Sequence, residues 1–93
     1  MKEIVQLHAN FKGNVQDVFF RQQVKAFAEE LNIKGYVKNL EDGSVEVIAM
    51  GNKNTLEKFL KKIEDKPGHG SISSIEKSFS EKGQSFDLFE ILF

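Results

Sequence analysis

The hydrophobic period of the chain changes abruptly near its start, and this change constrains the fold more than any other feature. Across residues 3–11, apolar and polar residues alternate, which predicts a strand with one face toward the core and one toward water. Between Val24 and Leu31, apolar residues recur at positions i, i+3, i+4 and i+7, which predicts a helix that ends near Leu31. The residues between these patterns must connect a strand to the first turn of a helix, and Arg21 lies in that turn.

The junction at residues 13–21 combines several features of an anion-binding site. The first amides of a helix have no partner inside the helix, and the helix dipole adds partial positive charge there. Gly13 can adopt backbone conformations that are closed to other residues and allows a ligand to approach closely, while the planar Arg21 guanidinium matches two phosphate oxygens. We therefore expect phosphate to bind here. The alternative is an ordinary arginine in a salt bridge with a nearby carboxylate, such as Asp17 or Glu29.

The middle of the chain predicts a β-hairpin. Residues 34–40 and 44–50 are short strand-like runs, and the Asp42-Gly43 pair between them is a strong hairpin signal. Asn39 lies at the end of the first run, where asparagine is a poor strand former and often simply begins a turn. From the residue type alone, Asn39 would be a turn residue.

The remainder of the chain predicts a helix followed by two strands. Apolar residues with helical spacing, after a possible cap at Asn52 or Asn54, predict a helix that ends near Asp65: Leu56, Phe59, Leu60 and Ile63. Residues 72–79 and 86–93 are strand candidates around a turn at residues 81–84, and the last strand carries apolar residues on both faces. This order of elements predicts an α+β fold, the ferredoxin-like α/β sandwich, with an antiparallel sheet and two helices packed on one face.

Length and composition predict one small domain over residues 1–93. The 93 residues are 40% hydrophobic and include no cysteine, so the core alone must stabilise a domain that we expect to be a monomer. A net charge of −1 with interleaved signs lacks the dense basic patch that a nucleic-acid or anionic-membrane surface needs. Two isolated histidines do not make a metal site, and no apolar run is long enough for a secretory signal or a membrane span. We therefore expect a cytoplasmic protein without a metal.

Three motifs follow one another along the chain: G-x-V-Q-x-V-x-F-R at residues 13–21, G-Y-V-K-N at residues 35–39 and D-G-S-V-E at residues 42–46. Together they resemble the acylphosphatase family, whose usual motifs are G-R-V-Q-G-V-x-F-R, G-W-V-x-N and D-G-x-V-E. The likeness extends over nearly the whole chain. It implies an enzyme that hydrolyses the carboxyl-phosphate bond of small acyl phosphates to carboxylate and phosphate, without metal or cofactor. A site that binds mainly the phosphate makes few specific contacts with the acyl group, so we expect small, soluble and varied substrates.

The resemblance also implies roles for individual residues. Arg21 would bind phosphate and Asn39 would orient the attacking water, since a carboxamide donates and accepts hydrogen bonds together. The proton of that water would pass to the phosphate oxygens of the substrate itself. The loop whose backbone would cradle the phosphate consists of Gly13, Asn14, Val15, Gln16, Asp17, Val18 and Phe19.

Two loop residues depart from the family's usual pattern. Asp17 stands where the family usually has glycine, and Asn14 replaces a residue that is commonly basic. A positive φ would strain Asp17, and a carboxylate ~4 Å from a bound dianion would cost roughly 1 to 4 kcal/mol per charge pair. Alternatively, the Asp17 side chain could cap the helix by accepting from the amide of Phe19 or Phe20, and it would then occupy donors that the phosphate needs. A third alternative is a side chain that points to water. The rival hypothesis is therefore a catalytically weak or inactive module that binds an anion or a protein partner.

Overall fold

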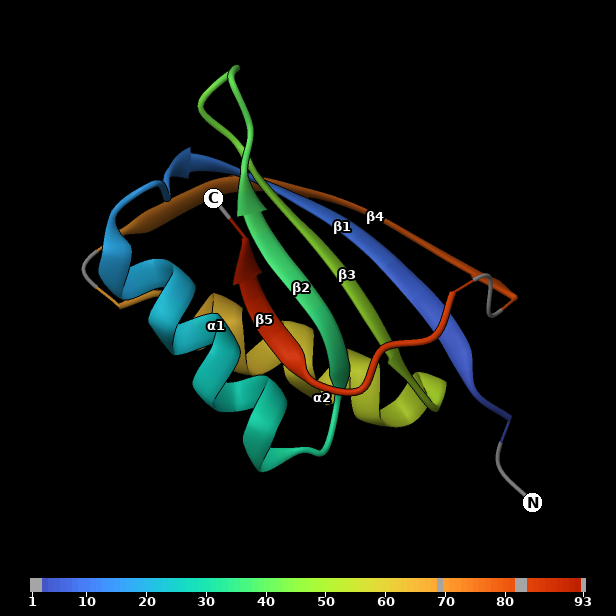
Figure 1. Cartoon of the computed structure of the whole chain (residues 1–93). Coiled ribbons are helices and arrows are strands. Elements are labelled where there is room, and N and C mark those ends of the chain that lie inside the picture. The colour runs from blue at the N-terminus through green and yellow to red at the C-terminus, as the bar shows by residue number, and fades with distance from the viewer. Residues whose placement is uncertain (1–2, 69, 82–83, 93) are drawn as a thin grey trace.

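A computed structural model describes residues 3–68, 70–81 and 84–92 of the chain. These residues form an α+β sandwich in which two helices cover one face of a five-stranded sheet (Figure 1). The elements in chain order are β1 (Val5–Asn14), α1 (Val18–Glu30), β2 (Lys34–Asn39), β3 (Val45–Gly51), α2 (Lys53–Asp65), β4 (Ser71–Glu81) and β5 (Phe89–Leu92). The ferredoxin-like α+β sandwich predicted from the sequence is confirmed.

The strand order in the sheet is β4-β1-β3-β2-β5. The three pairs among β4, β1, β3 and β2 are antiparallel, as expected. Strand β5 instead pairs parallel to β2 at the edge opposite β4. The sheet is therefore mixed, and the prediction of a wholly antiparallel sheet is wrong for this last strand. Part of the turn predicted at residues 81–84 lies outside the described residues.

The path into β5 explains its place at the far edge. The Phe86 ring lies edge-on to Tyr36, with ring centroids 6.0 Å apart, and the Gly35 amide donates to the Leu88 carbonyl at 3.0 Å. The chain therefore crosses the sheet face that the helices leave open before it reaches β2 (Figure 1). Phe89 is then 3% exposed and its ring packs against Phe59 of α2. Burial of this side chain under the helices favours β2 as the partner strand.

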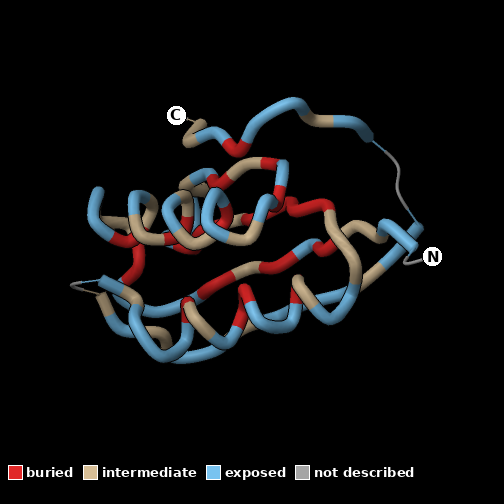
Figure 2. The backbone as a smooth tube through the Cα atoms, turned by 90° about the horizontal axis from the view of Figure 1, so that it is seen from below, coloured by how far each residue is buried: buried red, intermediate tan, exposed pale blue. Residues whose placement is uncertain are grey.

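The core lies between the sheet and the two helices (Figure 2). Strand β1 follows its predicted alternation, because Leu7, Ala9 and Phe11 are completely buried while His8 on the opposite face is exposed. Helix α1 adds Phe20, whose ring meets Phe11 edge-on at 5.6 Å between centroids. The apolar stripe of α2 is buried as predicted: Leu56, Phe59, Leu60 and Ile63. One continuous cluster thus fixes the orientation of α1 against the end of β1.

Candidate active site

Four chain segments meet at one end of the sheet: the end of β1, the start of α1, the end of β2 and the start of β3 (Figure 1). Strands β1 and β2 both run antiparallel to β3, so they point in the same direction. Val45, the first residue of β3, pairs with Phe11 of β1 on one side and with Asn39 of β2 on the other. Asn39 therefore lies at the same end of the sheet as the loop at residues 15–17, with β3 between its strand and β1.

This loop presents its backbone at the start of α1. Val15 is only 1% exposed and anchors the loop in the core, whereas Val18 is 46% exposed. Within the described part of the chain, the amides of Gln16, Asp17 and Val18 donate no hydrogen bond. Three such consecutive donors at a helix N-terminus can bind an anion, and phosphate binding at this junction stays a prediction.

Gly13 has the unusual backbone conformation that the sequence predicted, with φ of 129°. The structural demand for glycine comes from the neighbouring strand: the pairing of β1 with β4 shifts in register between Lys12 and Gly13. A Cβ at this position would overlap the Ser71 carbonyl oxygen and would lie 2.7 Å from the Ser73 nitrogen. Close packing of two strands therefore requires glycine here, and close approach of a ligand stays a prediction.

Asp17 is the N-cap of α1, and one of the three sequence-based alternatives is thereby confirmed. Its Oδ1 accepts from the Phe20 amide at 3.0 Å, and its backbone is extended, with φ of −78° and ψ of 160°. The expected strain of a positive φ is therefore absent, and the alternative of a side chain that points only to water is wrong. The occupied amide is that of Phe20, outside the predicted loop at residues 13–19, so the cap itself takes none of the amides of that loop.

Arg21 and Asn39 approach the loop from different elements. Arg21 is the fourth residue of α1 and is half-buried beside the loop. Asn39 ends β2, and its Nδ2 donates to the Gln16 carbonyl across a long 3.5 Å contact. Among the described residues, the buried Oδ1 of Asn39 has no hydrogen-bond partner. A buried acceptor without a partner is costly in a structural turn residue and is explained by a ligand or a water.

Comparisons with known proteins point to one family. A family model for acylphosphatase matches residues 7–91. The chain belongs to the acylphosphatase family. The acylphosphatase of Archaeoglobus fulgidus is 38% identical over 90 residues, which cover 97% of this chain and 100% of that protein. The acylphosphatase of Dehalococcoides mccartyi is 41% identical over 86 residues, or 91% of this chain and 94% of that protein. The crystal structure of acylphosphatase from Bacillus subtilis matches with a TM-score of 0.90 at 29% identity and covers 96% of this chain and 99% of that one.

One contact at this candidate site was not predicted from the sequence. The side-chain Nε2 of Gln16 donates to the Leu40 carbonyl at 2.6 Å and to the Ser44 carbonyl at 2.8 Å. The sequence places Gln16 in the predicted loop but indicates no role for its side chain. Its acceptors lie 24 and 28 residues further along the chain, so no local pattern could have identified them.

The open face of the sheet carries a separate set of polar contacts. Glu46 accepts from the Tyr36 hydroxyl at 2.9 Å and lies 3.1 Å from Nε2 of His8. Burial, together with this bond to the Glu46 carboxylate, raises the pKa of Tyr36 to about 12. Lys12 forms an ion pair with Glu76 at 3.2 Å, so its charge is already partly balanced on this face. These contacts hold strands together and none of them reaches the loop.

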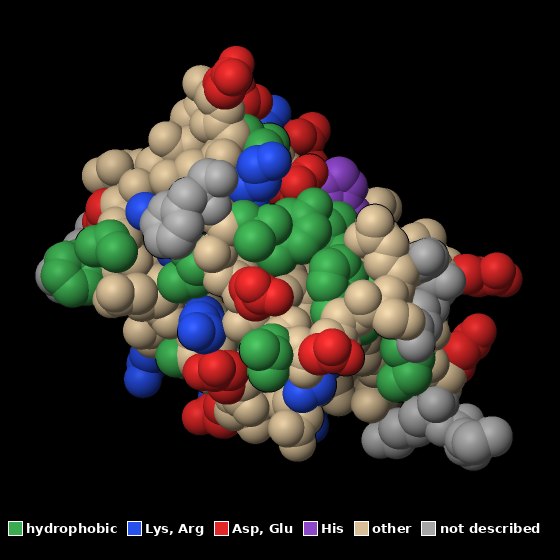
Figure 3. All heavy atoms as spheres, in the orientation of Figure 1, with side chains coloured by type: hydrophobic (Ala, Val, Ile, Leu, Met, Phe, Trp, Pro, Cys, Tyr) green, Lys and Arg blue, Asp and Glu red, His purple; other side chains and the backbone are tan. Residues whose placement is uncertain are grey.

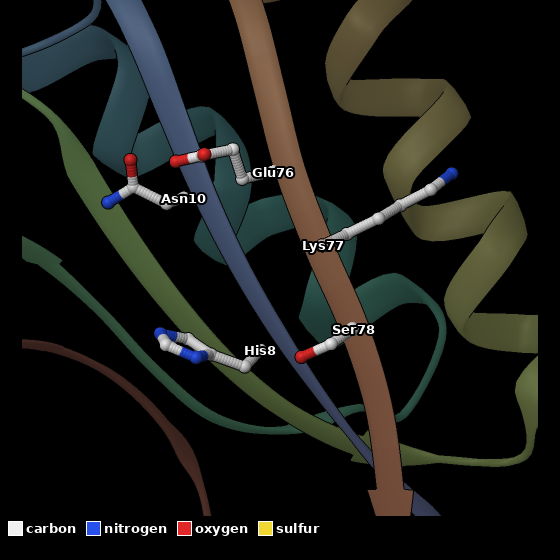
Figure 4. A pocket seen from close by; sticks show the side chains of 5 residues that line it. All are labelled: His8, Asn10, Glu76, Lys77 and Ser78. Carbon is white, nitrogen blue, oxygen red and sulfur yellow. The ribbon is translucent and has the colours of Figure 1, made fainter.

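A shallow hollow on this face lies between β1 and β4 (Figure 4). Asn10 and Glu76 border it, while the Lys77 side chain points to the side of α2 (Figure 4). On the side of the molecule shown in Figure 3, acidic and basic side chains are interleaved. Among the described residues, no group of three or more potential ligands could hold a metal ion. None of the described helices has the length and apolar character needed to cross a membrane.

Proposed function

We propose that this acylphosphatase-family protein hydrolyses the carboxyl-phosphate bond of small acyl phosphates. One observation carries the proposal: three amides that find no acceptor among the described residues, those of Gln16 to Val18, lie at one end of the sheet with Asn39. Arg21 is in the first turn of the helix that follows them. The names of the matched relatives support the same activity.

Catalysis in this proposal consists mainly of positioning and electrostatic stabilisation. The loop amides and the Arg21 guanidinium hold the phosphoryl oxygens, on which charge is spread in the transition state. Donors that are already oriented need no reorganisation when that charge develops. The carboxylate of an acyl phosphate is a good leaving group, so the reaction proceeds without a covalent intermediate on the protein.

Asn39 orients the attacking water in this proposal. Its buried Oδ1 accepts a hydrogen bond from the water, which aligns the water with phosphorus. A neutral carboxamide has no capacity to keep the proton, so the proton passes to a phosphate oxygen of the substrate. The role of Asn39 is therefore orientation, and its removal should lower kcat more than it weakens phosphate binding.

The observed cap favours an active enzyme over the rival hypothesis of a silent module. Asp17 adopts an ordinary extended backbone and takes up the Phe20 amide, so it neither strains the loop nor occupies its predicted donors. The remaining effect of Asp17 is the negative charge that it places near a bound phosphate. We propose that this charge weakens substrate binding and leaves the chemical step intact.

The decisive experiment measures hydrolysis of benzoyl phosphate by the purified protein in the presence of a chelator. Arg21→Ala should abolish most of the turnover, and Asn39→Ala should lower kcat while inhibition by inorganic phosphate persists. Lys58→Ala and Asn54→Ala remove a cation and a carboxamide at exposed positions of α2 and serve as matched controls. Unchanged turnover in Arg21→Ala would contradict the proposed mechanism.

We also propose that the protein acts as a single-domain monomer over residues 1–93 in the cytoplasm, without metal or cofactor and without binding nucleic acid or membranes. The single core cluster, to which both helices contribute, supports one domain. The balanced net charge of −1 supports the absence of a nucleic-acid or anionic-lipid partner. Light scattering of the purified protein tests the monomer, and turnover after exhaustive chelation tests the independence from metal.

A further inference from the structure

The Gln16 side chain spans the gap between the loop and the hairpin that connects β2 to β3. Its Nε2 donates both of its hydrogens, one to the Leu40 carbonyl at 2.6 Å and one to the Ser44 carbonyl at 2.8 Å. The two residues that accept from Gln16 are also hydrogen-bonded to each other, because the Leu40 amide donates to the Ser44 carbonyl at 2.9 Å. A single carboxamide thus binds the last turn before β3 at two points.

The far end of this connection is held firmly. Ser44 is only 3% exposed and is the one buried polar residue among those described. Its Oγ donates to Asp42 Oδ1 at 2.5 Å and accepts from Asn10 Nδ2 of β1 at 3.0 Å. The Ser44 amide also donates to Asp42 Oδ1, at 2.9 Å. The hairpin end that receives Gln16 is therefore fixed by β1 as well as by its own turn.

The bond from Gln16 to Leu40 affects the position of Asn39, the residue proposed to orient water. Leu40 follows Asn39 in the chain, so the bond from Gln16 to the Leu40 carbonyl fixes the backbone next to Asn39. The Gln16 carbonyl in turn accepts from Asn39 Nδ2, at 3.5 Å. The same residue lies in the loop whose amides face the anion. One residue thus sets the distance between the loop and the Asn39 carboxamide.

We propose that the side-chain carboxamide of Gln16 is a positioning residue that holds Asn39 in register with the phosphate loop. The inference rests on the proposed function, because its kinetic consequence requires that Asn39 orients water. Without these bonds, the loop still presents its backbone amides, but Asn39 is no longer fixed against them. Misplacement of a reacting group by about 1 Å lowers turnover by about 100-fold.

A double-mutant cycle with Gln16→Met and Asn39→Ala tests the proposal. Methionine keeps the length of the side chain and removes both donors. Gln16→Met should lower kcat by about 100-fold in the wild-type background and by at most about threefold in the Asn39→Ala background. The inhibition constant of inorganic phosphate should stay within about threefold, because the loop amides are retained. Gln22→Met, at an exposed position of α1, is the matched control and should leave both constants unchanged.

Two kinetic results would overturn the proposal. One is an equal loss of kcat from Gln16→Met in both backgrounds, which would show that Gln16 acts independently of Asn39. The other is a phosphate inhibition constant that worsens as much as kcat falls, which would assign Gln16 to the cradle alone.

Nuclear magnetic resonance makes the test independent of turnover, and the first of its two measurements needs no variant. In the wild-type protein, the side-chain amide protons of Gln16 should exchange with water far more slowly than those of the exposed Gln22. In Gln16→Met, the side-chain amide signal of Asn39 should shift while the Kd of inorganic phosphate stays within about threefold. Equal exchange rates for Gln16 and Gln22, or an unshifted Asn39 signal, would overturn the proposal. Absence of benzoyl phosphate hydrolysis in the wild type would contradict the proposed function and leave these two measurements valid.

Discussion

The two helices begin with nearly the same cap, yet only α1 lies beside the proposed phosphate site. Asp17 caps α1 with φ of −78° and ψ of 160°, and its side chain accepts from the Phe20 amide at 3.0 Å. Asn52 caps α2 with φ of −76° and ψ of 155°, and accepts from the Thr55 amide at 3.0 Å. A capped helix N-terminus is therefore not sufficient for a phosphate site.

The difference lies in what precedes and surrounds each helix. A single residue, Asn52, separates β3 from α2, so no loop can present additional amides there. Three residues separate β1 from α1, and the amides of Gln16 and Asp17 in this loop find no acceptor in the described part of the chain. An arginine in the first turn and an asparagine from a neighbouring strand complete the arrangement at α1. The loop and its neighbours, more than the helix dipole, make the site.

The largest expected effect is on activity, and it distinguishes the cation in the first turn of α1 from the cation in the first turn of α2. Arg21→Ala should lower kcat/KM for benzoyl phosphate by about 1,000-fold, since the loss of one preorganised donor to a developing oxyanion costs about 100- to 1,000-fold and a full charge is lost with it. Lys53→Ala removes a cation from the first turn of α2 and should leave kcat/KM unchanged. Steady-state kinetics on both variants makes the measurement. Comparable losses in both would show that general electrostatics, and not the α1 site, controls turnover.

The second effect concerns a glycine near the end of each strand that precedes a helix, Gly13 in β1 and Gly51 in β3. A Cβ at Gly13 would overlap the Ser71 carbonyl and would require a φ of 129°. A Cβ at Gly51 would meet only side-chain atoms of Leu56 and Ile33, at 3.6 Å or more. Gly13→Ala should therefore lower the free energy of unfolding by about 3 kcal/mol, and Gly51→Ala by less than about 1 kcal/mol. Urea titrations measure both values, and equal losses would refute the structural explanation of Gly13.

Local patterns were sufficient to predict most of this architecture. The alternation of β1, the helical spacing of both helices and the Asp42-Gly43 hairpin all report on contacts within a few residues of each other. The cap at Asp17 was one of three alternatives, because aspartate is favoured at this position for a local reason. Its strain was expected only by analogy with a family glycine, and the extended backbone of Asp17 removes that reason.

The features that could not be predicted depend on contacts between distant parts of the chain. Strand β5 carries apolar residues on both faces, so its pattern fixes neither its partner nor its direction. Its parallel pairing with β2 follows from the crossing segment that contacts Tyr36 through Phe86. The acceptors of the Gln16 side chain are likewise remote in sequence. Topology and side-chain connections of this kind require the fold.

The third effect concerns the charge of the two N-cap residues, which should affect phosphate binding at α1 and not at α2. Asp17→Asn keeps an acceptor for the Phe20 amide and removes a carboxylate near the bound phosphate. It should lower KM for benzoyl phosphate and the inhibition constant of inorganic phosphate by about tenfold at low ionic strength, and by less in high salt. Asn52→Asp adds the same charge at α2 and should leave both constants unchanged. An unchanged KM in Asp17→Asn would show that the carboxylate is too distant or too well screened to affect the substrate.

The smallest effect is the one in which the two helices should behave alike. Asp17→Ala and Asn52→Ala each remove a side-chain acceptor from a helix amide, so each should lower the free energy of unfolding by about 1 kcal/mol. The loss at Asp17 should exceed the loss at Asn52 by about 0.5 kcal/mol at low ionic strength, because only the aspartate carries a charge that interacts with the helix dipole. High salt should remove this excess, since the dipole interaction is screened while the two hydrogen bonds are not. An excess that persists in high salt would show that Asp17 stabilises the loop through contacts other than its charge. The cap would then be part of the architecture of the site as well as the start of the helix.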